Sequence, residues 1–251
     1  MMEALKFRKD YRIHVYETGP GGKLSIFSLF NFMQDIASDH AESLGFGRND
    51  LMKENWFWVL SRLYLEMSRW PEWEETITLY TWPNGTDRLF ALRNFGFFDK
   101  DKRQIGGASS SWLVLDNGTR KIIRPENLLQ RRNIQRLDNI PVRNPAKLER
   151  EVEQAEHDHC FCIKTSDLDI NLHTNNAAYL RWIYDSYDFG FIMKNDPQSA
   201  EINYLAESKH GETVRISTSS DNRFFDHSIR REEDKKELCR VRIEWMEQNV
   251  R

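Results

Sequence analysis

The sequence predicts an α+β protein of two tandem modules, each an antiparallel β-sheet wrapped around one long α-helix. Two observations support this prediction. The expected order of elements in the first half is a strand, a turn, a helix and several strands, and it recurs in the second half. The 251 residues are also enough to bury a real core. We place the modules at residues 1–135 and 157–251, and assign residues 136–156, a polar stretch containing Pro141 and Pro145, to a linker.

The first module begins with a short strand at residues 11–16 and a Gly-rich turn at residues 19–22. Apolar residues then recur with helical spacing over residues 24–44, and Ser25 is a suitable N-cap. Segments rich in aromatic and β-branched residues follow, separated by turn residues such as Pro83-Asn84-Gly85. These predict strands at 56–67, 75–82, 88–99 and 105–116.

The second module repeats this order. A strand is expected at residues 157–164, and a polar segment takes the place of the Gly-rich turn. A helical pattern then runs from about residue 176 to residue 193. The strands expected after it lie at 200–208, 212–219, 224–231 and 238–248.

Composition narrows the class of protein. Charged residues make up 30% and hydrophobic residues 39%, as in a soluble globular protein, and the net charge of −3 gives no basic field for nucleic acid or membrane. No apolar run approaches the length of a membrane span, and the first ten residues do not resemble a signal peptide. Three cysteines provide no disulfide framework. We therefore expect a cytoplasmic protein.

The run HDHCFC at residues 157–162 has the residue types of a metal site. On a strand, however, His157 and His159 face one way while Cys160 and Cys162 face the other. These four side chains could not bind one ion without breaking the strand. We expect no metal and no cofactor.

The segment DLDINLHTNN at residues 167–176 is the strongest functional signal. In an extended backbone, Asp167, Asp169, Asn171 and His173 would all point to one face. They stand directly before the second helix, where free backbone N–H groups and the helix dipole stabilise negative charge. This arrangement suits acyl-transfer chemistry, in which an oxyanion develops.

Each of these residues has a chemical and a structural interpretation. Asp169 could attack a thioester carbonyl, take a proton from water, or merely cap the turn. His173 could orient water or protonate a leaving thiolate, and Asn171 could donate to a carbonyl oxygen or hold the histidine. Glu207 is the best-placed partner acid, although it could equally be an exposed strand residue. Asn175 and Asn176 are most simply N-caps.

Two other mechanisms are disfavoured. The chain has no Gly-x-Ser-x-Gly elbow, which argues against an α/β-hydrolase. The cysteines lie neither in the polar turn nor beside Glu207, so a cysteine–histidine pair has no obvious nucleophile.

The segment at 167–176, followed by Tyr179, closely resembles the catalytic segment of acyl-ACP thioesterases of plants and bacteria. The resemblance covers most of the chain. Further landmarks similar to that family's occur in order in the first half. They are WVLSR at 58–62, RWPEW at 69–73, TW at 81–82 and ASSSW at 108–112.

This resemblance implies a double hotdog fold and hydrolysis of fatty acyl thioesters on acyl carrier protein. By position, the family's catalytic residues fall on Asp169, Asn171, His173 and Glu207. The plant enzymes have a cysteine directly after this glutamate, where this chain has Ser208. We favour a mechanism in which the carboxylates and the histidine act and the cysteine is dispensable. The lack of a plastid-type leader suggests a bacterial member.

The implied substrate needs an apolar tunnel and a basic docking surface. The first helix and the aromatic strands could line the tunnel. The residues we assign to it are Phe27, Phe30, Met33, Trp56, Phe57, Trp58 and Trp112. Acyl carrier protein is acidic, so its docking surface should be basic. The densest basic stretch comprises Arg120, Lys121, Arg124, Arg131, Arg132 and Arg136, which could also be a solvated linker.

Other functions remain open, because a hotdog scaffold does not determine the reaction. The closest alternative is an acyl-CoA thioesterase. A hydratase or dehydratase would also use a histidine and a carboxylate, but would release no thiol. A non-catalytic acyl-thioester-binding protein would not need the Asp/Asn/His/Glu set. A homodimer is also possible, because the edge strands of hotdog sheets often pair.

Overall fold

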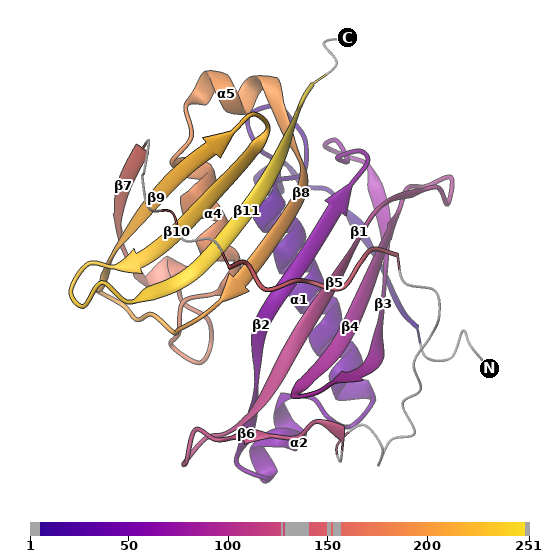
Figure 1. Cartoon of the computed structure of the whole chain (residues 1–251). Coiled ribbons are helices and arrows are strands. Elements are labelled where there is room, and N and C mark those ends of the chain that lie inside the picture. The colour runs from indigo at the N-terminus through magenta and orange to yellow at the C-terminus, as the bar shows by residue number, and fades with distance from the viewer. Residues whose placement is uncertain (1–5, 127, 129–140, 150–151, 153–156, 249–251) are drawn as a thin grey trace.

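The computed structural model describes residues 6–126, 128, 141–149, 152 and 157–248. In this part of the chain, eleven strands form one antiparallel sheet in the order β1-β3-β4-β5-β2-β8-β11-β10-β9-β7, with β6 paired to β5. Two helices, α1 and α4, pack against each other on one face of this sheet (Figure 1). The order is palindromic: β1 to β5 occupy the places that β7 to β11 occupy in the other half.

The described part of the first half contains four long strands, two short ones and one long helix. Its elements are β1 (Phe7–Arg12), α1 (Ile26–Ser43), α2 (Arg48–Lys53), β2 (Trp56–Met67), β3 (Thr76–Asp87), β4 (Phe90–Phe98), β5 (Gln104–Asp116) and β6 (Ile122–Ile123). The helix begins where predicted, because the Ser25 side chain accepts a hydrogen bond from the Ser28 N–H.

The second half repeats the first with a shorter central helix. Its elements are β7 (His157–Cys162), α4 (Asn176–Asp185), α5 (Phe189–Lys194), β8 (Asn195–Tyr204), β9 (Thr213–Asp221), β10 (Phe224–Arg231) and β11 (Glu237–Glu247). A single 3₁₀ turn follows the first strand of each half, at Val15–Glu17 and at Thr165–Asp167.

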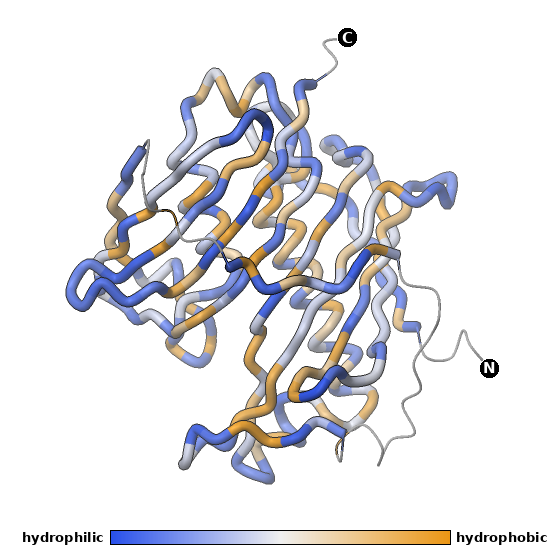
Figure 2. Tube along the Cα trace, viewed as in Figure 1, coloured by the Kyte–Doolittle hydropathy of each residue, from blue (hydrophilic) through white to orange (hydrophobic). Residues whose placement is uncertain are grey.

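The two halves meet where β2 pairs with β8, from Arg62↔Asn203 to Glu66↔Ser199. One hydrophobic core continues beneath this pairing. It includes Leu29 of α1, Ile183 of α4 and Ile202 of β8, all fully buried. Apolar and polar residues alternate along many of the strands, as expected for a sheet with one face on a core (Figure 2).

Residues 141–149 of the predicted linker cross the face of the sheet opposite the helices (Figure 1). Arg143 lies over the ring of Tyr64 and forms an ion pair with the buried Glu201. The backbone N–H of Ala146 also donates to Glu201, at 2.6 Å. These contacts tie the segment to β2 and β8 at once. The predicted module boundary at residue 135 lies outside the described residues.

Several predicted boundaries are wrong for local reasons. The first strand is Phe7–Arg12 rather than 11–16, because residues 15–17 turn into the 3₁₀ helix. The PNG sequence at 83–85 lies within β3 as a bulge, and the chain reverses later, at Arg88, whose φ is 53°. The helix predicted to reach residue 193 stops at Asp185, and Asp188 caps the separate helix α5.

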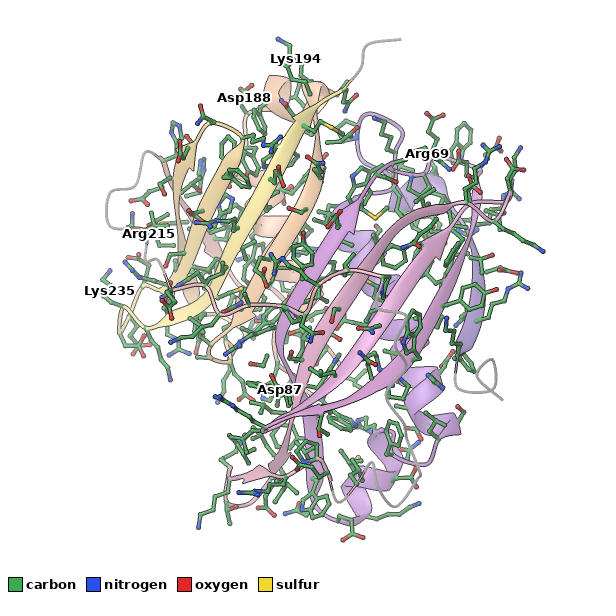
Figure 3. All side chains as sticks on the ribbon, turned by 45° about the vertical axis from the view of Figure 1, so that its right-hand side comes forward. Arg69, Asp87, Asp188, Lys194, Arg215 and Lys235 are labelled. Carbon is green, nitrogen blue, oxygen red and sulfur yellow. The ribbon has the colours of Figure 1, made fainter. Side chains whose placement is uncertain are left out.

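Surface features are consistent with a polar exterior. Charged side chains project from the periphery, among them Asp188 and Lys194 at the two ends of α5 (Figure 3). Among the described residues, no helix is long and apolar enough to span a bilayer.

Candidate active site

The polar segment before α4 takes the place of the Gly-rich turn, as predicted, but its backbone is a tight turn and not the extended conformation that the expected alternation of side chains requires. The Asp169 N–H donates to the His173 carbonyl at 2.8 Å, and the Leu172 N–H donates to the Asp169 carbonyl at 3.1 Å. Leu172 has a φ of 62°, in the left-handed region. The expected alternation of side chains along one face is therefore wrong, although the turn still brings Asp169, Asn171 and His173 together.

Asp167 does not belong to this group. It ends the 3₁₀ turn and is buried, and its carboxylate accepts hydrogen bonds from Arg181 and from the Trp182 indole, both on α4. Its backbone carbonyl accepts from the Asn175 N–H at 2.8 Å. Asp167 thus anchors the turn to the helix and faces away from Asp169.

The Asp169 carboxylate is held by its own turn. One oxygen, Oδ1, accepts from the N–H groups of Asn171 at 2.8 Å and His173 at 3.2 Å. The other, Oδ2, accepts from the Asn171 side-chain amide at 3.3 Å. These three hydrogen bonds restrict the rotamers of the carboxylate. Asp169 is therefore a preorganised carboxylate on the wall of a cavity.

His173, in the turn before α4, lies close to Glu207, in the segment after β8. His173 Nε2 lies 3.7 Å from Glu207 Oε2. Glu207 stands in the segment after β8, which ends at Tyr204, so it is not a strand residue. Its other oxygen, Oε1, lies 3.5 Å from the guanidinium of Arg120, which follows β5 in the first half.

Asn171 is the most exposed member of the predicted set. Its amide N–H₂ donates to Asp169, and its carbonyl oxygen accepts from Arg48 at 3.5 Å. The role of donor to a substrate carbonyl, which we expected from the sequence, stays a prediction.

Asn175 is the N-cap of α4, as predicted, whereas Asn176 is the first helical residue. The Asn175 side chain accepts from the Ala177 N–H at 2.9 Å, and its carbonyl accepts from the Ala178 N–H at 2.9 Å. Gln34 of α1 also donates to Asn175, at 3.0 Å. Two of the first helical N–H groups are thus already bonded, so the helix acts on the site mainly through its dipole.

Ser208 is buried in a hydroxyl network. Its Oγ lies 2.8 Å from the Tyr179 hydroxyl and donates to Thr174 Oγ1 at 2.7 Å. The Thr174 N–H donates to the Ser208 carbonyl at 3.2 Å. This network joins the Glu207 segment to the turn and to α4, which holds Glu207 opposite His173.

A cavity of about 1720 Å³ opens beside these residues. It runs between α1 and the sheet of the first half, and the residues of the turn and of the Glu207 segment form part of its wall. Its apolar lining comes from α1, β2, β4 and β5. These lining residues include Ala37, Ala41, Trp58, Leu60, Ala91 and Trp112.

The lining residues that we predicted from the strands are confirmed, and those predicted from the first helix are wrong. Trp56, Phe57, Trp58 and Trp112 line the cavity. Phe30 and Met33 are instead buried in the hydrophobic core, and Phe27 packs edge-on against Tyr184. The helix turns its next stretch, residues 34–41, toward the cavity, because the wide apolar stripe covers both the core and the cavity wall.

Several residues of the site had little signal in the sequence. Arg120 was expected only within a docking surface, yet it contacts Glu207. Arg48 and the buried Arg93 also line the cavity. Of the predicted basic stretch, Arg131, Arg132 and Arg136 lie outside the described residues.

His157, His159, Cys160 and Cys162 all lie on the exposed edge strand β7. Within the described residues, no group of three or more His, Cys, Asp or Glu side chains could hold a metal ion.

Comparison with known proteins identifies the family. The model of the acyl-ACP thioesterase N-terminal domain matches residues 4–129, and that of the C-terminal domain matches residues 150–247. The crystal structure of an acyl-ACP thioesterase from Bacteroides thetaiotaomicron is 26% identical, with a TM-score of 0.89 over 98% of this chain and 100% of that one. The α+β double hotdog fold predicted from the sequence is thereby confirmed.

Plant proteins are similar as well. The structure of the 12:0-ACP thioesterase of Umbellularia californica, 24% identical, shares the fold with a TM-score of 0.87, covering 97% of this chain and 98% of that one. An oleoyl-acyl carrier protein thioesterase of Coriandrum sativum is 25% identical over 236 residues, which are 86% of this chain and 63% of that protein. The chain thus spans a little under two thirds of the length of the curated relatives it matches first.

Proposed function

This chain belongs to the acyl-ACP thioesterase family, and from that premise we propose that it hydrolyses fatty acyl-ACP to free fatty acid and acyl carrier protein in lipid metabolism. One observation carries the proposal. Asp169, His173 and Glu207 converge on the wall of a large and mostly apolar cavity. The cavity suits an acyl chain, and the polar group suits the thioester at its end.

The proposed reaction begins at Asp169. Its Oδ2, which among the described residues accepts a hydrogen bond only from the Asn171 amide, either attacks the carbonyl carbon or takes a proton from the water that does so. A C–O bond forms, the carbonyl oxygen becomes an oxyanion, and its collapse breaks the C–S bond. Where Asp169 is the nucleophile, water then attacks the mixed anhydride, which releases the fatty acid and regenerates the carboxylate. The oxyanion is stabilised by the dipole of α4 and by the Asn171 amide.

His173 and Glu207 complete the reaction. Glu207 orients the imidazole from 3.7 Å, and Arg120 restrains Glu207 in turn. The imidazole positions the attacking water and supplies a proton to the leaving thiolate. Ser208 takes no covalent part, because its hydroxyl is buried and committed to Tyr179 and Thr174.

The charge around the cavity supports acyl carrier protein, rather than CoA, as the carrier of the acyl group. Four exposed cationic side chains contribute to its lining from separate segments: Arg48, Arg120, Lys209 and Lys236. An acidic partner would be steered to this rim, and salt would screen the attraction. A carrier-protein substrate should therefore lose more of its kcat/KM with added salt than a CoA substrate does.

The test is thiol release from acyl-ACP and acyl-CoA esters of matched chain lengths, with Asp169→Ala as the control. We expect release from the carrier-protein esters, with loss of release but not of binding in the variant. Release from CoA esters alone would make the protein an acyl-CoA thioesterase. Conversion without thiol release would indicate a hydratase or dehydratase, and tight binding without conversion would indicate an acyl-thioester-binding protein.

A further inference from the structure

The inner wall of the cavity carries a cation. Arg93 lies on β4 and pairs with Ser110 of β5, whereas Trp112, two residues along β5, pairs with Leu60 of β2. The Trp58↔Val114 pair is one residue from Phe57, and the guanidinium of Arg120 lies over the Phe57 ring and also contacts Glu207. This pair therefore marks the end of the cavity beside the catalytic turn. From Val114 to Ser110 the strand advances roughly 13 Å at 3.3 Å per residue. Arg93 therefore stands well inside, away from the thioester site.

The protein partners of this guanidinium are neutral. Arg93 Nη1 donates to Thr81 Oγ1 at 3.1 Å and lies 3.2 Å from Nδ1 of His40 on α1. Burial, together with the charge of Arg93, lowers the pKa of His40 to about 3, so its imidazole is uncharged at neutral pH. Within the described residues, no carboxylate lies within ion-pair distance of Arg93.

Most of the donors of this guanidinium have no acceptor among the residues that the structure describes. A guanidinium has five N–H groups, and both observed contacts use Nη1. Among the described residues, none accepts a hydrogen bond from Nε or Nη2. Arg93 is only 7% exposed, and it lines the cavity. A buried cation with free donors is costly unless something in the cavity supplies acceptors.

We propose that the cavity ends in a polar subsite, formed by Arg93, which binds an oxygen atom carried on the acyl chain. The subsite deepens the proposed function, on which it rests, by naming the substrate class as an oxygen-bearing acyl thioester. A hydroxyl or a carboxylate far from the thioester would accept the free N–H groups, and a carboxylate could take two at once. An unsubstituted chain long enough to reach Arg93 would displace water and leave these N–H groups without a hydrogen-bond acceptor.

The test is displacement of a fluorescent fatty acid by free acids of matched carbon number. Each length is measured unsubstituted, with a terminal hydroxyl and with a terminal carboxylate, on the wild type and on Arg93→Met. The control variant is Arg62→Met, which removes an arginine that lies over Phe90 and does not line the cavity. Because binding is read directly, the assay does not depend on thiol release.

In the wild type, we expect one range of lengths at which an oxygen-bearing chain binds about tenfold more tightly than its unsubstituted match, as a hydrogen bond to a charged group allows. The ratio should fall to near one in Arg93→Met and persist in Arg62→Met. The larger of the hydroxyl and carboxylate ratios then identifies the chain end. Wild-type ratios near one at every length would overturn the subsite, even if Arg93→Met failed to fold.

Thiol release separates this result from the proposed function. A wild-type affinity ratio near one, in a protein that still releases thiol from acyl-ACP, would contradict only the subsite and leave the proposed hydrolase function standing. A normal ratio without thiol release would do the reverse.

Discussion

The two turns that precede α1 and α4 share a backbone and differ in side chains. Gly19 N–H donates to Lys23 O at 2.9 Å, and Asp169 N–H donates to His173 O at 2.8 Å. Gly22 and Leu172 have φ values of 75° and 62°. The equivalent positions of the two turns are therefore Gly19 and Asp169, Gly21 and Asn171, and Lys23 and His173.

The segments opposite the turns differ in the same way. Leu24 N–H donates to the Pro71 carbonyl in the first half, where Thr174 N–H donates to the Ser208 carbonyl in the second. The residues before these carbonyls are Trp70 and Glu207. Trp70 is buried and donates to Pro197 O at 2.7 Å, and Lys23 forms an ion pair with Asp196 at 2.5 Å.

The space between helix and sheet also differs between the halves, and here it is the first half that has the functional feature. The 18-residue helix α1 leaves the large cavity between itself and the sheet, whereas α4 stops after 10 residues. Aromatic rings from α5 and its surroundings then pack together, with Tyr187 4.9 Å from Trp245 and Phe191 5.2 Å from Phe225. The first half thus provides most of the cavity, and the second half provides the side chains that we propose to react. The fold itself does not specify the chemistry.

The largest effect should come from Asp169→Asn. The amide keeps the shape of the turn but cannot act as a base or nucleophile, so kcat/KM should fall by about 10³-fold. Steady-state thiol release measures this fall, and an unchanged thermal unfolding curve would show that the turn is intact. A loss of less than tenfold would remove Asp169 from the mechanism.

His173→Ala and Glu207→Gln should follow, each with a loss of about 10²-fold in kcat/KM. Because we propose that Glu207 acts through His173, the double variant should lose little more than the worse single variant. Fully multiplicative losses would mean that the two residues act separately.

Ser208 distinguishes a structural from a covalent role. Ser208→Ala removes hydrogen bonds to Tyr179 and Thr174 and should lower the free energy of unfolding by about 1–3 kcal/mol. Its kcat/KM should stay within about tenfold of the wild-type value, because Ser208 takes no part in the proposed chemistry. Removing a group that does take part typically lowers kcat/KM by more than about tenfold. A complete loss of turnover in a folded Ser208→Ala protein would make the hydroxyl a participant.

The buried His227 of the second half predicts a dependence of stability on pH. Burial lowers its pKa from 6.5 to about 3, while Tyr187 and Thr218 bond its two nitrogens. The unfolded chain therefore binds more protons than the folded one between these values, and stability falls as pH drops below 6.5. His227→Gln should reduce this slope by about 1.4 kcal/mol per pH unit. Denaturant unfolding from pH 6 to 4 measures it, and equal slopes would contradict the assignment.

The smallest effect concerns the shared backbone of the turns. Gly22→Ala places a Cβ in the left-handed region and should cost about 1 kcal/mol. Leu172→Gly relieves the same strain at the equivalent position but adds freedom to the unfolded chain, so stability should change by less than about 0.5 kcal/mol. Equal costs at both positions would mean that the two turns are not equivalent.

The sequence predicts the repeat well because helix and strand periods extend over many residues. The strand expected at 56–67 is observed as Trp56–Met67. This periodicity does not predict local exceptions, namely the bulge at Pro83, the end of the helix at Asp185 and the left-handed backbone of Leu172. Each of them depends on contacts or backbone angles that a sequence pattern does not contain.

The site was predictable in part for the same reason. Asp169, Asn171 and His173 are close in sequence, and a family resemblance placed Glu207 beside them. The partners of Arg93 could not be predicted, because His40, Thr81 and Arg93 come from three elements, and only the register of β3 and β4 beneath α1 brings them together.

The most direct test of the comparison is to give the second turn the side chains of the first. The variant Asp169→Gly, Asn171→Gly, His173→Lys is assayed for thiol release from acyl-ACP, with thermal unfolding measured in parallel. The shared backbone predicts a folded protein whose thiol release does not exceed the uncatalysed rate. A folded variant that still turned over substrate would place the chemistry elsewhere in the molecule.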